Sequence, residues 1–299
     1  MASDSRVAFG SFSSDRGALK NIPIGHYYAV LLAGNDVVYA MPTIKRVRKA
    51  MSDDMTDPDE IAMLLHDELA ATLRQKIESR ILRKIGMTME LFLTSGKESL
   101  TESVYYDIFS EIRREEMSLT FLLAGFDSSG TAHIRVVTSD DAPQDYDLLG
   151  FAAIGSGALN ALASLSFAKD YNSLSESNDI HEVTYHVLVA KFMAESATDV
   201  GKDTFYVCIG PSGICHFLNP FAGGVDPIRK EWEQSGAPRT SVETLEVIKA
   251  IGYHSPDKAD SLEMLERVKV HASPVNRSII EKKISMLKQS ALSMSKDQK

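Results

Sequence analysis

The sequence predicts an α+β fold in which a pair of sheets lies between outer layers of helices. The prediction rests first on the order of the elements: strands, two or more helices, strands, two helices, and a last pair of strands. Two strand pairs are joined by short polar turns, which favours antiparallel pairing. A hydrophobic content of 44% in 299 residues is sufficient for one large core and an extension.

The first half of the chain alternates between apolar strands and amphipathic helices. Residues 29–33 are apolar and β-competent, and Gly34 ends the run before a helix-like spacing begins. From 58 to 85 apolar residues recur every three or four positions, with acidic residues early and basic residues late, as the dipole of a long helix favours. A further helix is predicted over 101–117, with Thr101 as its N-cap. The polar run 95–99 is interpreted as a turn.

The second half predicts two hairpins, a single strand and two helices. These are the hairpin strands 119–126 and 133–137, the strand 151–154, helices over 159–167 and 179–197, and the hairpin strands 205–209 and 214–217. The buried face of the helix over 179–197 is expected at Val183, Val187, Ala190 and Met193. We therefore expect a first domain over 1–218. Residues 219–299 are expected to form a helical extension, with helices near 242–251 and 279–287 and a polar tail.

Composition excludes several classes of protein. The net charge of −9 argues against nucleic-acid binding, which needs clustered basic residues. No apolar run approaches the roughly 20 residues that span a bilayer, and the start of the chain lacks the pattern of a signal peptide, so we expect a cytoplasmic protein that does not enter a membrane. Cys208 and Cys215 match no metal-binding spacing and are expected to be buried thiols.

Four short blocks carry a more specific signal. They are Ser3-Asp4-Ser5-Arg6, Leu31-Leu32-Ala33-Gly34, Leu122-Leu123-Ala124-Gly125-Phe126-Asp127 and Phe151-Ala152-Ala153-Ile154-Gly155-Ser156-Gly157. In this order the blocks resemble the proteasome β subunits and their bacterial relatives, which are N-terminal-nucleophile (Ntn) hydrolases. The likeness covers roughly residues 2–217. It implies a four-layer αββα sandwich, hydrolysis of peptide bonds in peptides or unfolded proteins, assembly into a homo-oligomeric ring, a possible ATPase partner, and no cofactor or metal.

The resemblance also assigns roles to five residues. Asp4 and Lys20 match the acid and the lysine that help to deprotonate the hydroxyl of an N-terminal threonine. Gly34 matches the glycine whose backbone N–H stabilises the oxyanion. Ser156 matches a serine that bonds near the nucleophile, and Asp199 matches the family's second acid.

The chain departs from the family pattern in three places. The spacing of the support residues puts the threonine ahead of Met1, so the nucleophile is not among these residues. Val200 or Gly201 stands where the family has a serine, and the region 57–115 is longer than the family's usual helix pair. Two hypotheses therefore stay open within the family: an active peptidase in a longer form of the chain, or a non-catalytic scaffold or assembly protein whose extension over 219–299 faces a partner.

A third class, a nucleotide-dependent enzyme, has weaker support. Gly155 and Gly157 resemble the start of a dinucleotide fingerprint, but Asn160 replaces the third glycine and a hairpin precedes the strand. His66, His181 and His186 lack the spacing of a zinc protease and are expected to be core or surface residues.

Overall fold

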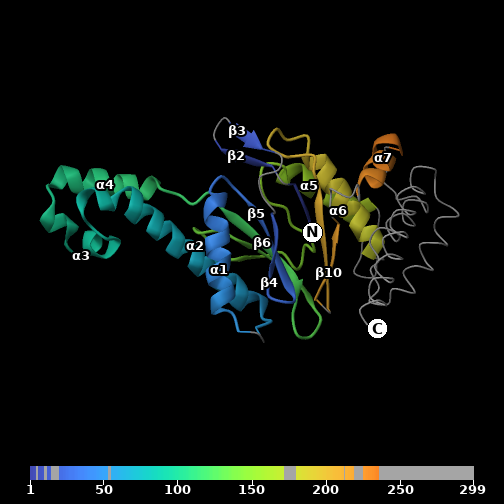
Figure 1. The fold of residues 1–299 in the computed structure, drawn as a ribbon, viewed down its shortest axis with the longest axis horizontal. Coiled ribbons are helices and arrows are strands. Elements are labelled where there is room, and N and C mark those ends of the chain that lie inside the picture. The colour runs from blue at the N-terminus through green and yellow to red at the C-terminus, as the bar shows by residue number, and fades with distance from the viewer. Residues whose placement is uncertain are drawn as a thin grey trace, which may run out of the picture. The chain divides into compact units, whose positions relative to one another are not determined.

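The structure is a computed structural model that describes residues 1–4, 6–9, 12–14, 20–52, 55–171, 180–211, 213–218 and 225–235 (Figure 1). It confirms a mixed α+β protein with antiparallel sheets. The chain divides into two compact units. We name Ile22–Gly155 the central unit, and Met1–Asn21 with Ser156–Lys299 the terminal unit. The predicted boundary at 218/219 stays a prediction, because the predicted helices near 242–251 and 279–287 lie outside the described residues.

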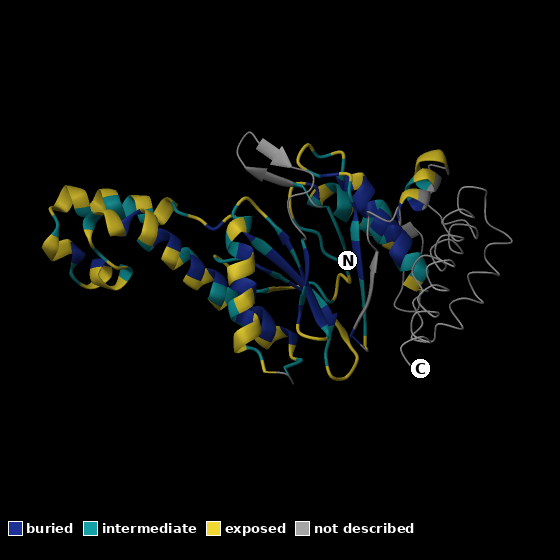
Figure 2. Ribbon diagram, viewed as in Figure 1, coloured by how far each residue is buried: buried dark blue, intermediate teal, exposed yellow. Residues whose placement is uncertain are grey.

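The central unit is built on a five-stranded antiparallel sheet with the order β4-β5-β6-β7-β8. Its strands are β4 (Asn21–Ile24), β5 (Tyr28–Ala33), β6 (Thr120–Phe126), β7 (Ala132–Val137) and β8 (Gln144–Asp145). The predicted strand over 29–33 and the hairpin of β6 and β7 are confirmed. The alternating apolar side chains of β5 and β6 enter one buried core, which Figure 2 shows as the dark blue centre of the sheet.

Helices of the central unit cover this sheet and then extend beyond it. They are η1 (Val37–Tyr39), α1 (Ala40–Ala50), α2 (Pro58–Arg80), η2 (Leu82–Ile85), α3 (Met89–Ser99) and α4 (Glu102–Arg114). The helix predicted from residue 58 begins there because Asp57 is its N-cap and accepts from the backbone N–H groups of Asp59 and Glu60. Ile44 on α1 and Ile61 on α2 are fully buried against the sheet.

The second half of α2, η2, α3 and α4 form a separate helical arm with its own core. Phe92 is the centre of this core, and its ring stacks on Tyr105 with centroids 5.0 Å apart. The predicted turn over 95–99 is wrong, because these residues continue α3, with Lys97, Glu98 and Ser99 exposed on its outer side. The helix that follows, α4, ends at Arg114 and not near the predicted end at 117, and its Val104 is exposed.

The terminal unit contains a three-stranded sheet of order β1-β9-β10 and a short hairpin of β2 and β3. Its strands are β1 (Ala2–Ser3), β2 (Val7–Phe9), β3 (Phe12–Ser14), β9 (Phe205–Gly210) and β10 (Gly213–Leu218). Its helices are α5 (Ala158–Tyr171), α6 (Ile180–Ala194) and α7 (Asp226–Ser235). The hairpin of β9 and β10 and the helices α5 and α6 confirm their predictions.

Two details of the sequence prediction are corrected. Residues 151–154 do not form a strand: all four are half-buried but irregular, since a short apolar run indicates burial and not pairing. The predicted buried face of α6 is correct in part. Ala190 is buried and Val183 and Val187 are half-buried, but Met193 is exposed, whereas Tyr185, Leu188 and Phe192 are also buried. The reason is that α6 packs against α5, α7 and β1, so burial is not restricted to one stripe.

Within the described part of the chain, no helix combines the length and the apolar character needed to cross a bilayer.

Candidate functional site

The structure brings Asp4 and Lys20 together in the terminal unit. The Lys20 ammonium lies 3.0 Å from Asp4 Oδ1, and the two side chains are only 15% and 12% exposed. The backbone N–H of Arg6 donates to the same carboxylate oxygen at 2.7 Å. Asp4 directly follows β1 and Lys20 directly precedes β4, so the two backbone segments hold the charges in place. The result is a largely buried ion pair between the acid and the lysine that the sequence singled out.

A turn after α6 carries Asp199 and lies beside the segment of Asp4. The guanidinium of Arg6 donates to the carbonyl oxygen of Thr198 at 2.9 Å, which connects residues 192 positions apart in the sequence. The same turn contacts the segment of Ser156: a Cβ built on Gly157 would lie 2.9 Å from Val200 Cγ2, closer than a real Cβ approaches. The side chains of Ser156 and Asp199 are exposed. Four of the five predicted residues thus occupy neighbouring segments of one unit.

A shallow pocket of about 280 Å³ opens on this turn. Its lining mixes hydroxyl groups with charges of both signs, and consists of Arg6, Glu195, Ser196, Ala197, Thr198, Val200, Lys202 and Asp203. This volume is just below the range of about 300–1,000 Å³ that is usual for small-molecule pockets, so the pocket can hold a small ligand or a polar portion of a larger one.

A charged cluster that the sequence analysis missed fixes the same turn from behind. Glu195 is 7% exposed and accepts from Arg229 through both carboxylate oxygens, at 2.6 and 2.8 Å, while Lys191 binds it from one turn earlier on α6. Lys191 also donates to the carbonyl oxygen of Gly201 at 2.7 Å, and Arg229 donates to that of Lys202 at 2.9 Å. The turn that carries Asp199 is therefore held by the buried Lys191 and the half-buried Arg229, which both bind Glu195 at its start and the carbonyl groups at its end.

The electrostatics of this cluster follow from its burial. Burial lowers the pKa of the Lys191 ammonium below its ordinary value, although the bond to Glu195 opposes that shift. The Arg229 guanidinium also lies over the ring of Phe192, 4.1 Å from the centroid. The spacing of Lys191 and Glu195, one helical turn apart, was readable in the sequence as an ion pair. Arg229 lies on α7, and no pattern connected it with α6.

Met1 is joined to the sheet of the terminal unit by both of its backbone groups. Its amine donates to the carbonyl oxygen of Val207 at 2.7 Å, and the N–H of Val207 donates back at 2.8 Å. Burial lowers the pKa of this amine to about 6. The amine of Met1 therefore completes hydrogen bonding with β9.

Gly34, the fifth predicted residue, belongs to the central unit. Its φ is +124°, and a Cβ at this position would lie 2.1 Å from the carbonyl oxygen of Ser118. The N–H of Asn35 donates to the Ser118 hydroxyl, and the N–H of Asp36 donates to the Ser118 carbonyl oxygen. Glycine is thus required here by backbone conformation and by close approach, independently of any role in binding.

A buried lysine, Lys76, fastens this turn to α2 and was also missed by the sequence analysis. Its ammonium lies 3.0 Å from the Asp36 carboxylate and 2.9 Å from that of Glu115, and it donates to the carbonyl oxygen of Glu116. Burial alone would lower its pKa, but the bonds to Glu115 and Asp36 outweigh burial and raise it. Lys76 is therefore charged, and it stiffens the turn at Gly34.

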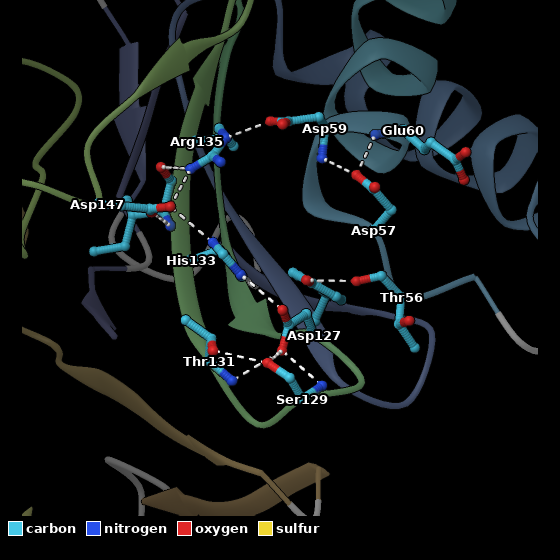
Figure 3. Close-up of polar contacts among 12 residues, drawn as sticks. Thr56, Asp57, Asp59, Glu60, Asp127, Ser129, Thr131, His133, Arg135 and Asp147 are labelled. Atoms are coloured by element: carbon cyan, nitrogen blue, oxygen red, sulfur yellow. Dashed lines mark hydrogen bonds and ion pairs between the residues drawn. The ribbon is translucent and has the colours of Figure 1, made fainter.

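Figure 3 shows a second charge network in the central unit, centred on His133. The imidazole lies between two carboxylates, with Nδ1 2.7 Å from Asp147 and Nε2 3.3 Å from Asp127. Arg135 extends the network from Asp147 to Asp59 at the start of α2, with its side chain 6% exposed. Burial lowers the pKa of His133, but the two carboxylates outweigh burial and raise it above the ordinary value.

This network does not form a nucleophile triad. The hydroxyl of Ser129 donates to Asp127 and not to the imidazole, and Asp127 also accepts from the backbone N–H groups of Ser129 and Thr131. These bonds lower the pKa of Asp127 to about 2. Asp127 therefore organises the turn between β6 and β7, and the network is structural.

Residue types that hold metals are not clustered in the described part of the chain: it contains no group of three or more His, Cys, Asp or Glu that could bind an ion. Cys208 is half-buried and not fully buried as predicted, and the side chain of Cys215 lies outside the description. His186 is a core residue and His66 bonds to the carbonyl oxygen of Thr138, in agreement with the prediction for the histidines.

The fold and these contacts define an α+β protein with antiparallel sheets and a buried ion pair beside a polar turn. No family model matches the sequence, and neither does any curated protein.

Proposed function

We propose that the chain is the frame of an Ntn hydrolase similar to the proteasome β subunits. The observation that carries the proposal is the buried ion pair of Asp4 and Lys20, which lies beside the segments of Ser156 and Asp199. These residues were selected from the sequence resemblance alone, and a chance alignment gives no reason for them to be neighbours in the fold. The ion pair is largely buried, and buried ion pairs are weak evidence for stability.

The proposal includes a four-layer αββα arrangement. It is supported by the composition of each unit, since each combines an antiparallel sheet with its own helices. The element order also agrees, with α1 and α2 between β5 and β6 and with α5 and α6 between β8 and β9. The resemblance assigns the oxyanion role to Gly34, which belongs to the central unit.

The chemistry follows from the residue types. A threonine hydroxyl attacks the carbonyl carbon of a peptide bond while its proton passes to the threonine α-amino group, which returns a proton to the leaving amine. The Lys20 ammonium, held by Asp4, lowers the cost of forming the alkoxide. The backbone N–H of Gly34 stabilises the oxyanion. Water then hydrolyses the ester, which releases the acid and regenerates the hydroxyl.

Residues 1–299 do not provide the threonine at the position that the resemblance assigns, so the proposal places it in a longer form of the chain, ahead of Met1. The substrate class is a peptide or an unfolded protein. The working form is a homo-oligomeric ring in the cytoplasm, with an ATPase as a possible partner.

A non-catalytic scaffold is the alternative, and one observation favours it. Where the family has a serine, Val200 and Gly201 offer no hydroxyl, and the carbonyl oxygen of Gly201 accepts from Lys191 instead. In this alternative the ion pair of Asp4 and Lys20 only supports the fold.

The test measures the rate at which the protein, purified from its own cells, cleaves fluorogenic peptides. Variants are prepared from the same cells in the same way, and their rates are compared with that of the wild type. We expect Lys20→Ala to reduce kcat by at least about a hundredfold, because the alkoxide loses its stabilising charge. The control is Lys97→Ala, an exposed lysine of α3 that lies outside the candidate site, which should retain activity. Absence of cleavage, or equal cleavage by the Lys20 variant, would support the scaffold.

A further inference from the structure

Helix α7 belongs to the extension over 219–299, beyond the part of the chain that resembles the family, and it packs against α6 in the terminal unit. Ile228 on α7 is fully buried in one core with Leu188 and Phe192 of α6. The ring of Trp232 lies 5.6 Å from that of Phe192. Because apolar contacts dock α7 on α6, the polar side chains of α7 have defined positions relative to the turn that follows α6.

Arg229 is the residue of α7 that reaches this turn. Its guanidinium binds Glu195 through two nitrogens, with Nη1 2.6 Å from Oε2 and Nη2 2.8 Å from Oε1, and it also donates to the carbonyl oxygen of Lys202 at 2.9 Å. A bidentate pair of this kind fixes orientation as well as distance. Arg229 therefore joins α7 to both ends of the turn between Glu195 and Lys202, which carries Asp199.

Direct contacts continue from this turn to the ion pair of the candidate site. The Arg6 guanidinium donates to the carbonyl oxygen of Thr198 in the middle of the turn, at 2.9 Å. The backbone N–H of Arg6 donates to Asp4 Oδ1 at 2.7 Å, and the Lys20 ammonium lies 3.0 Å from the same oxygen. A contiguous series of bonds thus connects α7 with Lys20, and all of its members belong to the terminal unit.

Lys191 provides a second connection between the turn and the ion pair. It donates to the carbonyl oxygen of Gly201 and binds Glu195, beside Arg229. Burial lowers the pKa of its ammonium, and the negative charges that oppose this shift are those of Glu195 and Asp4. Asp4 is therefore close enough to act electrostatically on the cluster that Arg229 completes.

We propose that Arg229 is a positioning residue of the candidate site, which holds the turn at Glu195 and Lys202 so that Arg6 and Asp4 keep the Lys20 ammonium in place. The inference rests on the proposed function, and it gives the extension a part in the reaction without contact with the substrate. A displaced ammonium stabilises the alkoxide less well, so the loss of Arg229 slows the chemical step and leaves the affinity for the substrate unchanged.

Cleavage of fluorogenic peptides by variants of the protein from its own cells tests the role of Arg229. Arg229→Met retains an apolar side chain but has no charge, and it should lower kcat about tenfold or more with KM unchanged. Arg229→Lys should recover part of this loss, because an ammonium can pair with Glu195 but lacks the two-pronged geometry of the guanidinium. The matched control is Lys230→Met, at the exposed neighbour on α7, which should cleave as the wild type does.

A double variant tests the route through Arg6. If Arg229 acts through Arg6, Arg6→Met with Arg229→Met should be no slower than the slower single variant, since both substitutions interrupt one series of contacts. Losses in kcat that multiply would overturn this route. A variant of Arg229 with a lower Tm and an unchanged kcat would show that Arg229 only supports the fold, and would overturn the inference.

Hydrogen exchange measured by mass spectrometry needs no cleavage and separates this inference from the proposed function. Arg229→Met should speed exchange about tenfold in peptides that contain the turn and Arg6, with no change in β9. If the wild type shows cleavage that depends on Lys20 while Arg229→Met keeps its kcat, the inference is overturned and the proposed function stands. If the wild type shows no such cleavage, the proposed function fails. Faster exchange at Arg6 would then support the connection from α7 to the ion pair, and unchanged exchange would overturn it.

Discussion

At the scale of single residues, Gly34 shows how a residue can match a functional pattern and also have a local structural reason. Its positive φ and its approach to Ser118 require glycine, whether or not its N–H meets a substrate. Asp4 also has a local reason, because its carboxylate accepts from the backbone N–H of Arg6 two residues later. Lys20 is different, since its described polar contact is the ion pair with Asp4. Lys20 therefore distinguishes the functional hypothesis better than the glycine does.

Substitution of Gly34 by alanine should destabilise the central unit by about 3 kcal/mol or more, since the methyl group meets a backbone oxygen and the φ is strained. The matched control is Gly86→Ala, with φ +70° and open space around the Cβ, for which about 1 kcal/mol is expected. Urea unfolding of both variants measures the difference. Equal losses would show that the segment of Ser118 moves away at little cost.

At the scale of elements, the network of His133 joins the hairpin of β6 and β7 to the start of α2. A protonated imidazole can donate to Asp127 and Asp147 at once, whereas a neutral one donates to only one of them. The pKa of His133 is raised in the folded state, so the stabilisation is complete below its ordinary pKa of 6.5 and is lost as the pH rises through the folded-state pKa.

His133→Gln should therefore reduce the free energy of unfolding by on the order of 1 kcal/mol near pH 6 and by less near pH 9. Asp127 and Asp147 stay ionised over this range because their pKa values are lowered, and Arg135 stays charged. Urea unfolding of the wild type and the variant over the range gives the difference. A loss that does not change with pH would assign the effect to packing alone.

Elements with strong periodicity could be predicted from the sequence, and those defined by distant partners could not. α2 and the hairpin of β6 and β7 were found because apolar spacing and turn residues are local signals. β1 and β8 are only two residues long and exist because a neighbouring strand pairs with them. α3 was not predicted, because the polar residues 95–99 are typical of turns. In the structure they are part of the helix that buries Phe92 in the core of the arm.

At the scale of the whole molecule, the sequence placed the candidate residues through family spacing but gave no account of how they are held. Arg6 reaches Thr198 across 192 positions, and Arg229 on α7 fixes Glu195 on α6. Contacts between residues so far apart in the sequence form only in the folded chain, so no periodic pattern in the sequence predicts them. The scaffold hypothesis expects the extension over 219–299 to face a partner, and this stays a prediction. Its described helix α7 supports the turn of Asp199 within the chain.

The central claim is that these residues form the frame around an N-terminal nucleophile, and the mature N-terminus tests it most directly. Intact mass and N-terminal sequencing of the protein from its own cells should find a chain that begins with threonine at the distance ahead of Asp4 set by the family pattern. A mature chain that begins at Met1, or with a residue that has no hydroxyl or thiol, would contradict the peptidase and leave the scaffold.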